Sequence, residues 1–181
     1  METIVTSPYD SPLGRLVIGA LGERICLCDW SDDGIRPRAI VEQRLRRRLE
    51  ARMEEGDAAV IDRARRQLDE YFSGARERFQ LSLAMGGTDL QLTVWQRLCS
   101  IPFASTVSYR ELAAAVGRPS AVRAVAAACG ANAISIIVPC HRVTGSDGSL
   151  TGYAGGVEAK RRLIAMERRA HISTLNDNLL T

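Results

Sequence analysis

The sequence predicts an α+β protein in which a small α/β part is followed by a mainly helical part. Two runs, 15–20 and 24–30, alternate apolar and polar residues on either side of Leu21-Gly22-Glu23, a pattern typical of an antiparallel hairpin. Beyond residue 88 the patterns are helical, and they include a helix, a glycine turn and a second helix. We therefore divide the 181 residues into a domain at 1–86, a domain at 87–169 and a loosely held tail at 170–181.

In the first domain, the hairpin is preceded by a turn at Asp10-Ser11-Pro12 and followed by two helices. The first helix starts near Pro37 and carries an apolar stripe that extends to Met53. The second is capped by Asp57 and ends at Gly74, and a strand is expected at 79–83. We find no candidate chemistry in this domain.

Two capping boxes mark helix starts in the second domain. Thr88 with Gln91 opens a helix that stops before Pro102, and Ser108 with Glu111 opens a helix over 109–116. In such a box each side chain accepts a hydrogen bond from the backbone N–H of the other residue, so both helix starts are specified locally.

A turn at Gly117-Arg118-Pro119 leads to a short helix that Ser120 is expected to cap and that runs to Cys129. This is the spacing of a helix-turn-helix, although many helical hairpins bind nothing. The second helix is rich in alanine, and Arg123 is its one long polar side chain. It offers little for reading base edges but permits close approach with one projecting guanidinium; a merely buried helix would look similar.

Positive charge is concentrated in the second domain. Residues 1–105 carry 15 basic against 16 acidic residues, whereas residues 106–169 carry nine basic against four acidic. This asymmetry favours an anionic partner such as nucleic acid, with a solvated basic face as the alternative.

Cys140 is the candidate nucleophile. The apolar run 134–138 reads as a buried strand that ends at Pro139, and His141 and Arg142 follow the cysteine directly. We expect an exposed, electropositive turn that lowers the pKa of the thiol. The other cysteines fit the description of small buried hydrophobic residues.

A final helix over 157–169 places Leu163, Ile164 and Glu167 on one face. A carboxylate on an apolar face needs a partner, and we nominate His141, which would give a Cys/His/Glu relay in which the glutamate favours imidazolium and imidazolium favours thiolate. Alternatively, Glu167 reaches water at a frayed helix end.

Composition excludes several classes of protein. Five cysteines without regular spacing argue against a disulfide framework, and no Cys/His cluster has the spacing of a zinc site, so we expect no metal. Neither a secretory leader nor an apolar run of membrane-spanning length is present. The expected location is the cytoplasm, with no membrane partner.

These residues together resemble one known family, the O6-alkylguanine-DNA alkyltransferases, also called methylated-DNA–protein-cysteine methyltransferases. The resemblance is strong over 88–167 and weaker before that, where it rests on Ser11-Pro12-Leu13-Gly14 and element order. It is carried by the following motifs: Pro139-Cys140-His141-Arg142-Val143, Ser108-Tyr109, Arg123-Ala124-Val125, Asn132 and Gly152-Tyr153-Ala154-Gly155-Gly156.

The resemblance implies a ribonuclease-H-like first domain and a direct-reversal repair protein that works once. It implies that Cys140 accepts the alkyl group from O6-alkylguanine, that His141 acts through a water as base, and that Glu167 orients His141. Tyr109 would hydrogen-bond the guanine ring nitrogen, and Asn132 would hold the turn before the cysteine. Whether O4-alkylthymine is also a substrate is left open.

The resemblance also implies a partner and its contacts. Double-stranded DNA with an alkylated guanine would bind the helix-turn-helix through its minor groove, and Arg123 would fill the gap left by an extruded nucleotide. The implied DNA-binding residues are Arg123, Tyr109, Arg118, Ala124 and Arg142, and the implied substrate pocket is lined by Val138, Tyr153 and Ala154. No cofactor is implied, and the protein is expected to be a monomer in solution, with cooperative binding on DNA left open.

The chain departs from the family at several glycines and prolines, of which two bear on the site. Ala126 stands where glycine is common on the DNA-facing helix, and Ala133 stands where proline commonly follows the asparagine. Two rival functions remain: a sensor that flips the lesion without repairing it, and a thiol hydrolase that uses Cys140, His141 and Glu167.

Overall fold

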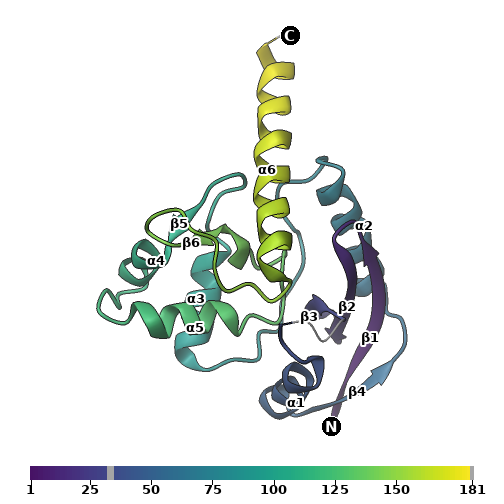
Figure 1. The fold of residues 1–181 in the computed structure, drawn as a ribbon. Coiled ribbons are helices and arrows are strands. Elements are labelled where there is room, and N and C mark those ends of the chain that lie inside the picture. The colour runs from purple at the N-terminus through teal and green to yellow at the C-terminus, as the bar shows by residue number, and fades with distance from the viewer. Residues whose placement is uncertain (32–34, 180–181) are drawn as a thin grey trace.

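The N-terminal part is built on a four-stranded sheet (Figure 1). The computed structural model describes residues 1–31 and 35–179. Strands β1 (Glu2–Ser11), β2 (Gly14–Leu21), β3 (Arg24–Trp30) and β4 (Ala51–Glu55) lie in the order β3-β2-β1-β4. The pairs β1–β2 and β2–β3 are antiparallel, and β4 runs parallel to β1. The predicted hairpin is thus confirmed as β2 and β3.

One helix covers each face of this sheet. Helix α2 (Ala59–Phe72) packs against the side on which Leu16 and Ile18 of β2 point, whereas α1 (Arg38–Leu49) packs against the side of Val17. Successive side chains of a strand point to opposite faces, so β2 supplies both cores. The core under α2 is continuous with the core of the helical part, which joins the two parts of the molecule.

Three local predictions in this part are wrong. The first helix ends at Leu49 because Glu50 adopts a left-handed conformation with φ of 49°, and the chain then continues as β4. Asp57 does not cap α2, because its carboxylate accepts hydrogen bonds from Ser7 and Arg65 instead. The expected strand at 79–83 is reduced to a single bridge between Leu83 and Ile25.

The helical part begins with α3 (Asp89–Leu98), and a two-residue strand β5 (Val107–Ser108) leads into α4 (Tyr109–Ala115). Both predicted capping boxes are present, at Thr88 and at Ser108, each with its reciprocal pair of hydrogen bonds. Helix α5 (Val122–Gly130) follows a turn in which Gly117 has a φ of 71°. Its N-cap is Ala121 rather than the expected Ser120, and no side chain caps it.

The segment between α5 and the cysteine is not the strand that its apolar run predicts. Ile134 makes one bridge to Cys28 of β3, and the chain then turns, with Ile136 at a φ of 71°. The run is nevertheless fully buried. A short 3₁₀ turn, η1 (Cys140–Arg142), and the strand β6 (Val143–Thr144), which pairs with β5, follow it.

Helix α6 (Gly156–Leu179) is longer than predicted. It continues through most of the expected tail because residues 170–178 contain neither glycine nor proline to stop it. Figure 1 shows its C-terminal end projecting away from the rest of the molecule. No helix in the described ranges combines the length and the apolar character that crossing a membrane requires.

Candidate active site

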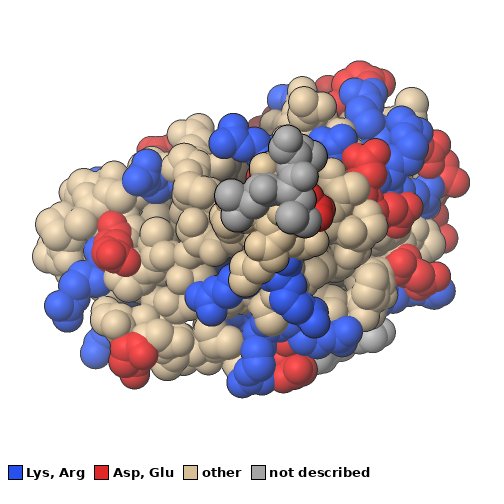
Figure 2. Space-filling model, turned by 90° about the horizontal axis from the view of Figure 1, so that it is seen from above, with Lys and Arg blue, Asp and Glu red and all other residues tan. Residues whose placement is uncertain are grey.

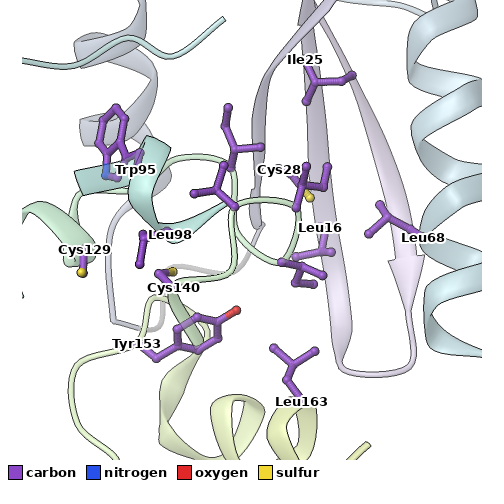
Figure 3. Packing of buried hydrophobic residues seen from close by; sticks show 14 of the residues in the cluster. Leu16, Ile25, Cys28, Leu68, Trp95, Leu98, Cys129, Cys140, Tyr153 and Leu163 are labelled. Atoms are coloured by element: carbon purple, nitrogen blue, oxygen red, sulfur yellow. The ribbon is translucent and has the colours of Figure 1, made fainter. Parts of the chain in front are cut away.

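Cys140 lies in the interior, where the two parts of the molecule meet. Figure 3 shows it among Leu98, Cys129 and Tyr153. Cys140 is 7% exposed, so the expectation that it lies on an exposed turn is wrong. Burial raises the pKa of the Cys140 thiol, although a hydrogen bond from Asn132 and the charges of Lys160 and Arg36 act in the opposite direction. The resting thiol is therefore protonated, and a base is needed to produce the thiolate.

Asn132 connects the end of α5 to the cysteine. Its side-chain amide donates to the carbonyl oxygen of Val138 at 2.9 Å and to the sulfur of Cys140 at 3.2 Å. Its side-chain oxygen accepts from the backbone N–H of Ile134 at 2.9 Å. One buried side chain thus fixes the loop on both sides of the apolar run, as the expectation for Asn132 requires.

His141 and Glu167 form the pair that helical periodicity predicts. The Nε2 atom of His141 lies 2.7 Å from Oε1 of Glu167, and both side chains are buried. Burial alone would raise the pKa of Glu167, but the hydrogen bonds from His141 and Arg142, together with the positive charge of the Arg142 guanidinium, lower it to about 2. Because Glu167 is ionised, Nε2 of His141 carries the proton in this pair and Nδ1 is left as the acceptor nitrogen.

The imidazole of His141 is nonetheless neutral at rest. Burial lowers the pKa of His141 more than the hydrogen bond and charge of Glu167 raise it. Glu167 therefore favours imidazolium, as expected, but burial outweighs it in the resting site. The Nδ1 atom of His141 has no hydrogen-bond partner among the described residues, so it is free to accept a proton.

Three further groups donate to the Glu167 carboxylate. The Tyr71 hydroxyl donates at 2.7 Å, the backbone N–H of Ala104 at 3.1 Å, and the Arg142 guanidinium through Nε and one terminal nitrogen at 3.0 and 2.9 Å. Arg142 also donates to the carbonyl oxygen of Ile101 at 2.7 Å. This geometry does not favour a contact of Arg142 with DNA, because its side chain is 7% exposed and each guanidinium nitrogen donates to Glu167 or Ile101.

An open cavity of about 540 Å³ is lined by Tyr109 and Tyr153, which both interact electrostatically with Cys140, although Cys140 itself does not line it. Four expected residues are among those that line it: Tyr109, Arg123, Tyr153 and Ala154. Val138 does not line it, because it is completely buried. Arg118, Arg123 and Ala124 are all exposed on the turn and helix beside the cavity.

The loop that carries Tyr153 packs against the N-terminal part. The rings of Tyr153 and Trp30 meet edge to face, with centroids 5.3 Å apart. A Cβ atom at Gly155 would lie 2.6 Å from the Trp30 ring, so only glycine permits this close approach. The first part of the chain therefore helps to shape the cavity, a contribution that the sequence does not reveal.

Lys160 is the buried cation that sequence reasoning missed. Its Nζ atom donates to the carbonyl oxygen of Thr151 at 3.0 Å and lies 3.5 Å from the Tyr109 hydroxyl. Burial raises the pKa of Tyr109 to about 12, so this phenol stays protonated and can act as a donor. Lys160 lies seven residues before Glu167, on the same helix face, and that periodicity was the signal that could have found it.

Charge is distributed unevenly over the surface. Figure 2 shows basic and acidic side chains densely mixed over the sheet half, and a group of basic side chains near the middle of the view. The helical half carries fewer, scattered charges on this face. Within the described ranges, no group of three or more His, Cys, Asp or Glu side chains is arranged to hold a metal ion.

Comparison with known proteins gives consistent matches over almost the whole chain. Residues 89–169 match the family model described as 6-O-methylguanine DNA methyltransferase, DNA binding domain, and residues 4–85 match its ribonuclease-like domain. The chain is 36% identical to the methylated-DNA–protein-cysteine methyltransferase of Haemophilus influenzae over 98% of its own length and 94% of that relative. It is 54% identical to the protein of the same name from Methanosarcina barkeri, over 58% of this chain and 66% of that relative.

Among solved structures, the fold matches that of Mycobacterium tuberculosis OGT in complex with DNA. The TM-score is 0.75 with 36% sequence identity, and the match covers 93% of this chain and 94% of the other. Both parts of the molecule are therefore included in the match.

Proposed function

Because this chain belongs to the methylated-DNA–protein-cysteine methyltransferase family, we propose that it repairs duplex DNA by transferring the alkyl group of O6-alkylguanine irreversibly to Cys140. One observation carries the assignment. Asn132 donates to the sulfur of Cys140, and His141 forms a buried pair with Glu167. Tyr109, which is close enough to interact electrostatically with Cys140, lines an open cavity together with Arg123.

Activation of the thiol falls to His141. The ionised Glu167 fixes Nε2 as the protonated nitrogen, which leaves Nδ1 to take the proton of Cys140 through an intervening water. The imidazolium that forms lies beside the Glu167 carboxylate, which stabilises it in the buried site. Proton transfer thus converts a buried neutral thiol and a buried neutral imidazole into a thiolate–imidazolium ion pair.

The chemical step forms one bond and breaks one bond. The thiolate of Cys140 attacks the alkyl carbon, the C–S bond forms, and the bond between that carbon and O6 of guanine breaks. Negative charge develops on the leaving base, and the protonated phenol of Tyr109 donates to its ring nitrogen. The proton removed from the thiol balances the one that guanine needs. A thioether is a poor leaving group, so the protein acts once.

Helices α4 and α5, which we interpret as a helix-turn-helix, bind the DNA. The alanine-rich exposed face of α5 permits close approach to the duplex, and Arg118, Arg123 and Ala124 lie on the exposed side. Flipping a nucleotide costs a few kcal/mol, and a side chain inserted into the stack offsets part of that cost. Arg123 also lines the cavity, so it stands where an extruded base would pass.

Replacing Arg123 with alanine is expected to weaken binding to a duplex with one O6-methylguanine about tenfold, because the vacated stack is no longer filled. Binding is measured by fluorescence anisotropy, with transfer measured in single turnover. Arg97→Ala removes the same charge from an exposed site on α3 and serves as the control. Unchanged affinity together with unchanged transfer in Arg123→Ala would remove Arg123 from the flipping mechanism.

The proposed function is tested by incubating the protein with duplex DNA that contains one O6-methylguanine, followed by intact and peptide mass measurement. We expect one methyl increment on Cys140, saturating at one per protein molecule. Tight lesion binding without an increment would indicate the lesion sensor. Repeated turnover of an ester or amide without an increment would indicate the thiol hydrolase.

A further inference from the structure

Two arginines of the N-terminal part hold the end of α5. Arg36 donates to the carbonyl oxygens of Gly130 at 2.6 Å and of Asn132 at 2.9 Å, and Arg44 donates to the carbonyl oxygen of Ala131 at 2.5 Å. Three successive carbonyls at the C-terminus of this helix are therefore satisfied by guanidinium groups from the other part of the molecule. Cations at this end of a helix also interact favourably with its dipole.

Asp29 at the end of β3 positions Arg36. Its carboxylate forms an ion pair with Arg36 and accepts from the Ser135 hydroxyl at 3.3 Å, and the residue is 7% exposed. The backbone of the adjacent Cys28 donates to the carbonyl of Ala133 and accepts from the N–H of Ser135. The segment 130–135 is thus bound along its length to the N-terminal part.

The same segment carries the side chain that reaches the reactive sulfur. The Asn132 carbonyl is bound by Arg36, while its side-chain amide donates to Cys140 Sγ. The contacts from Arg36 therefore restrain the turn from which the Asn132 side chain reaches the sulfur.

We propose that Asp29 and Arg36 are a positioning pair for alkyl transfer: they fix the turn that carries Asn132 and set the charge around the Cys140 thiol. The N-terminal part would then take part in the chemistry rather than only support the fold. This inference rests on the proposed function in one respect, the assignment of Cys140 as the alkyl acceptor.

Several groups besides the pair influence the thiol. Burial is the largest influence and raises the pKa of Cys140. The hydrogen bond from Asn132 and the charges of Lys160 and Arg36 lower it, and Asp29 raises it. Tyr109, Tyr153 and Cys129 also face the thiol, and burial raises the pKa of each, so they are uncharged near neutral pH. The two members of the pair therefore act on the thiol with opposite signs.

Because the charges of Asp29 and Arg36 shift the pKa of the thiol in opposite directions, substituting each of them distinguishes an electrostatic role from a purely structural one. The rate at which iodoacetamide alkylates Cys140 is measured by peptide mass as a function of pH in Asp29→Asn and Arg36→Gln. We expect Asp29→Asn to react about threefold faster than wild type at pH 8, and Arg36→Gln about threefold slower. Changes in the same direction in both variants, or no change in either, would overturn the proposal.

Two further variants complete the design. Asp10→Asn disrupts an exposed Asp–Arg pair in the same part of the chain and should leave the pH profile of Cys140 unchanged. Arg36→Lys keeps the charge but cannot reach the two carbonyls and Asp29 together, so alkyl transfer should slow while the pH profile of the thiol shifts less than in Arg36→Gln. Transfer at the wild-type rate in Arg36→Lys would contradict the positioning role.

The iodoacetamide assay uses no DNA. If wild-type protein took no methyl group from DNA, the proposed function would be wrong. The opposite shifts in thiol reactivity would still be measurable in that case. Conversely, normal methyl transfer with no opposite shifts would leave the proposed function intact and remove the pair from it.

Discussion

Cys140→Ala is expected to take no methyl group from DNA and to retain selective binding to the lesion. The substitution removes the acceptor atom, whereas Tyr109 and Arg123, which line the cavity, remain in place. Mass measurement after incubation with the lesion duplex reads out transfer, and anisotropy reads out binding. Cys99→Ala, which removes an exposed cysteine, is the matched control and should transfer at the wild-type rate.

The neighbouring Cys129 cannot take over this role. Burial raises the pKa of its thiol to about 12, and neither a base nor a carboxamide holds its sulfur among the contacts of the described residues. A methyl increment on any other residue of Cys140→Ala, or loss of lesion selectivity together with transfer, would contradict the separation of binding from chemistry.

The features that sequence predicts correctly depend on few residues close together. Both capping boxes form because donor and acceptor lie three residues apart. The hairpin forms for a similar reason, because alternation and a short turn specify it locally. The contact between His141 and Glu167 was also predictable, since an acidic residue on an apolar helix face requires a partner and few candidates exist.

The features that sequence could not predict depend on the other part of the molecule. The apolar run at 134–138 resembles a strand, yet it becomes a series of turns because Asn132 and β3 satisfy its backbone. The cysteine motif suggests an exposed basic turn, yet Glu167 draws both His141 and Arg142 inward and leaves the thiol buried. Asp29 and Arg36 acquire their role only when the two parts are packed together.

Glu167→Gln is expected to destabilise the protein by about 3–5 kcal/mol and to slow alkyl transfer about 100-fold. The carboxylate accepts hydrogen bonds from Tyr71, Ala104, His141 and Arg142, and a glutamine amide would face some of these donors with N–H groups of its own. The buried guanidinium of Arg142 would lose its counter-charge, and His141 would lose the group that fixes its tautomer.

Urea unfolding at pH 7 measures the stability, and single-turnover transfer to Cys140 measures the rate. Glu158→Gln makes the same substitution on the same helix, where an exposed glutamate pairs with Arg161. That control should change stability by less than about 1 kcal/mol and leave transfer unchanged. If Glu167→Gln were as stable as the control, the carboxylate would not be what stabilises the hydrogen bonds of Tyr71, Ala104, His141 and Arg142.

The pH dependence of stability distinguishes the contribution of the Glu167 charge from the contribution of its packing and hydrogen-bond geometry. Folding lowers the pKa of Glu167 from 4.5 to about 2, so its ionised form stabilises the folded state above pH 4.5. This contribution of about 3 kcal/mol is lost as the pH falls through that interval, because the unfolded chain binds the proton first. The deficit of Glu167→Gln relative to wild type should therefore be largest at pH 7 and shrink toward pH 3, whereas Glu158→Gln should show no such change. A deficit of equal size at both pH values would assign the loss to packing and hydrogen-bond geometry, and the charge that orients His141 would have to come from elsewhere.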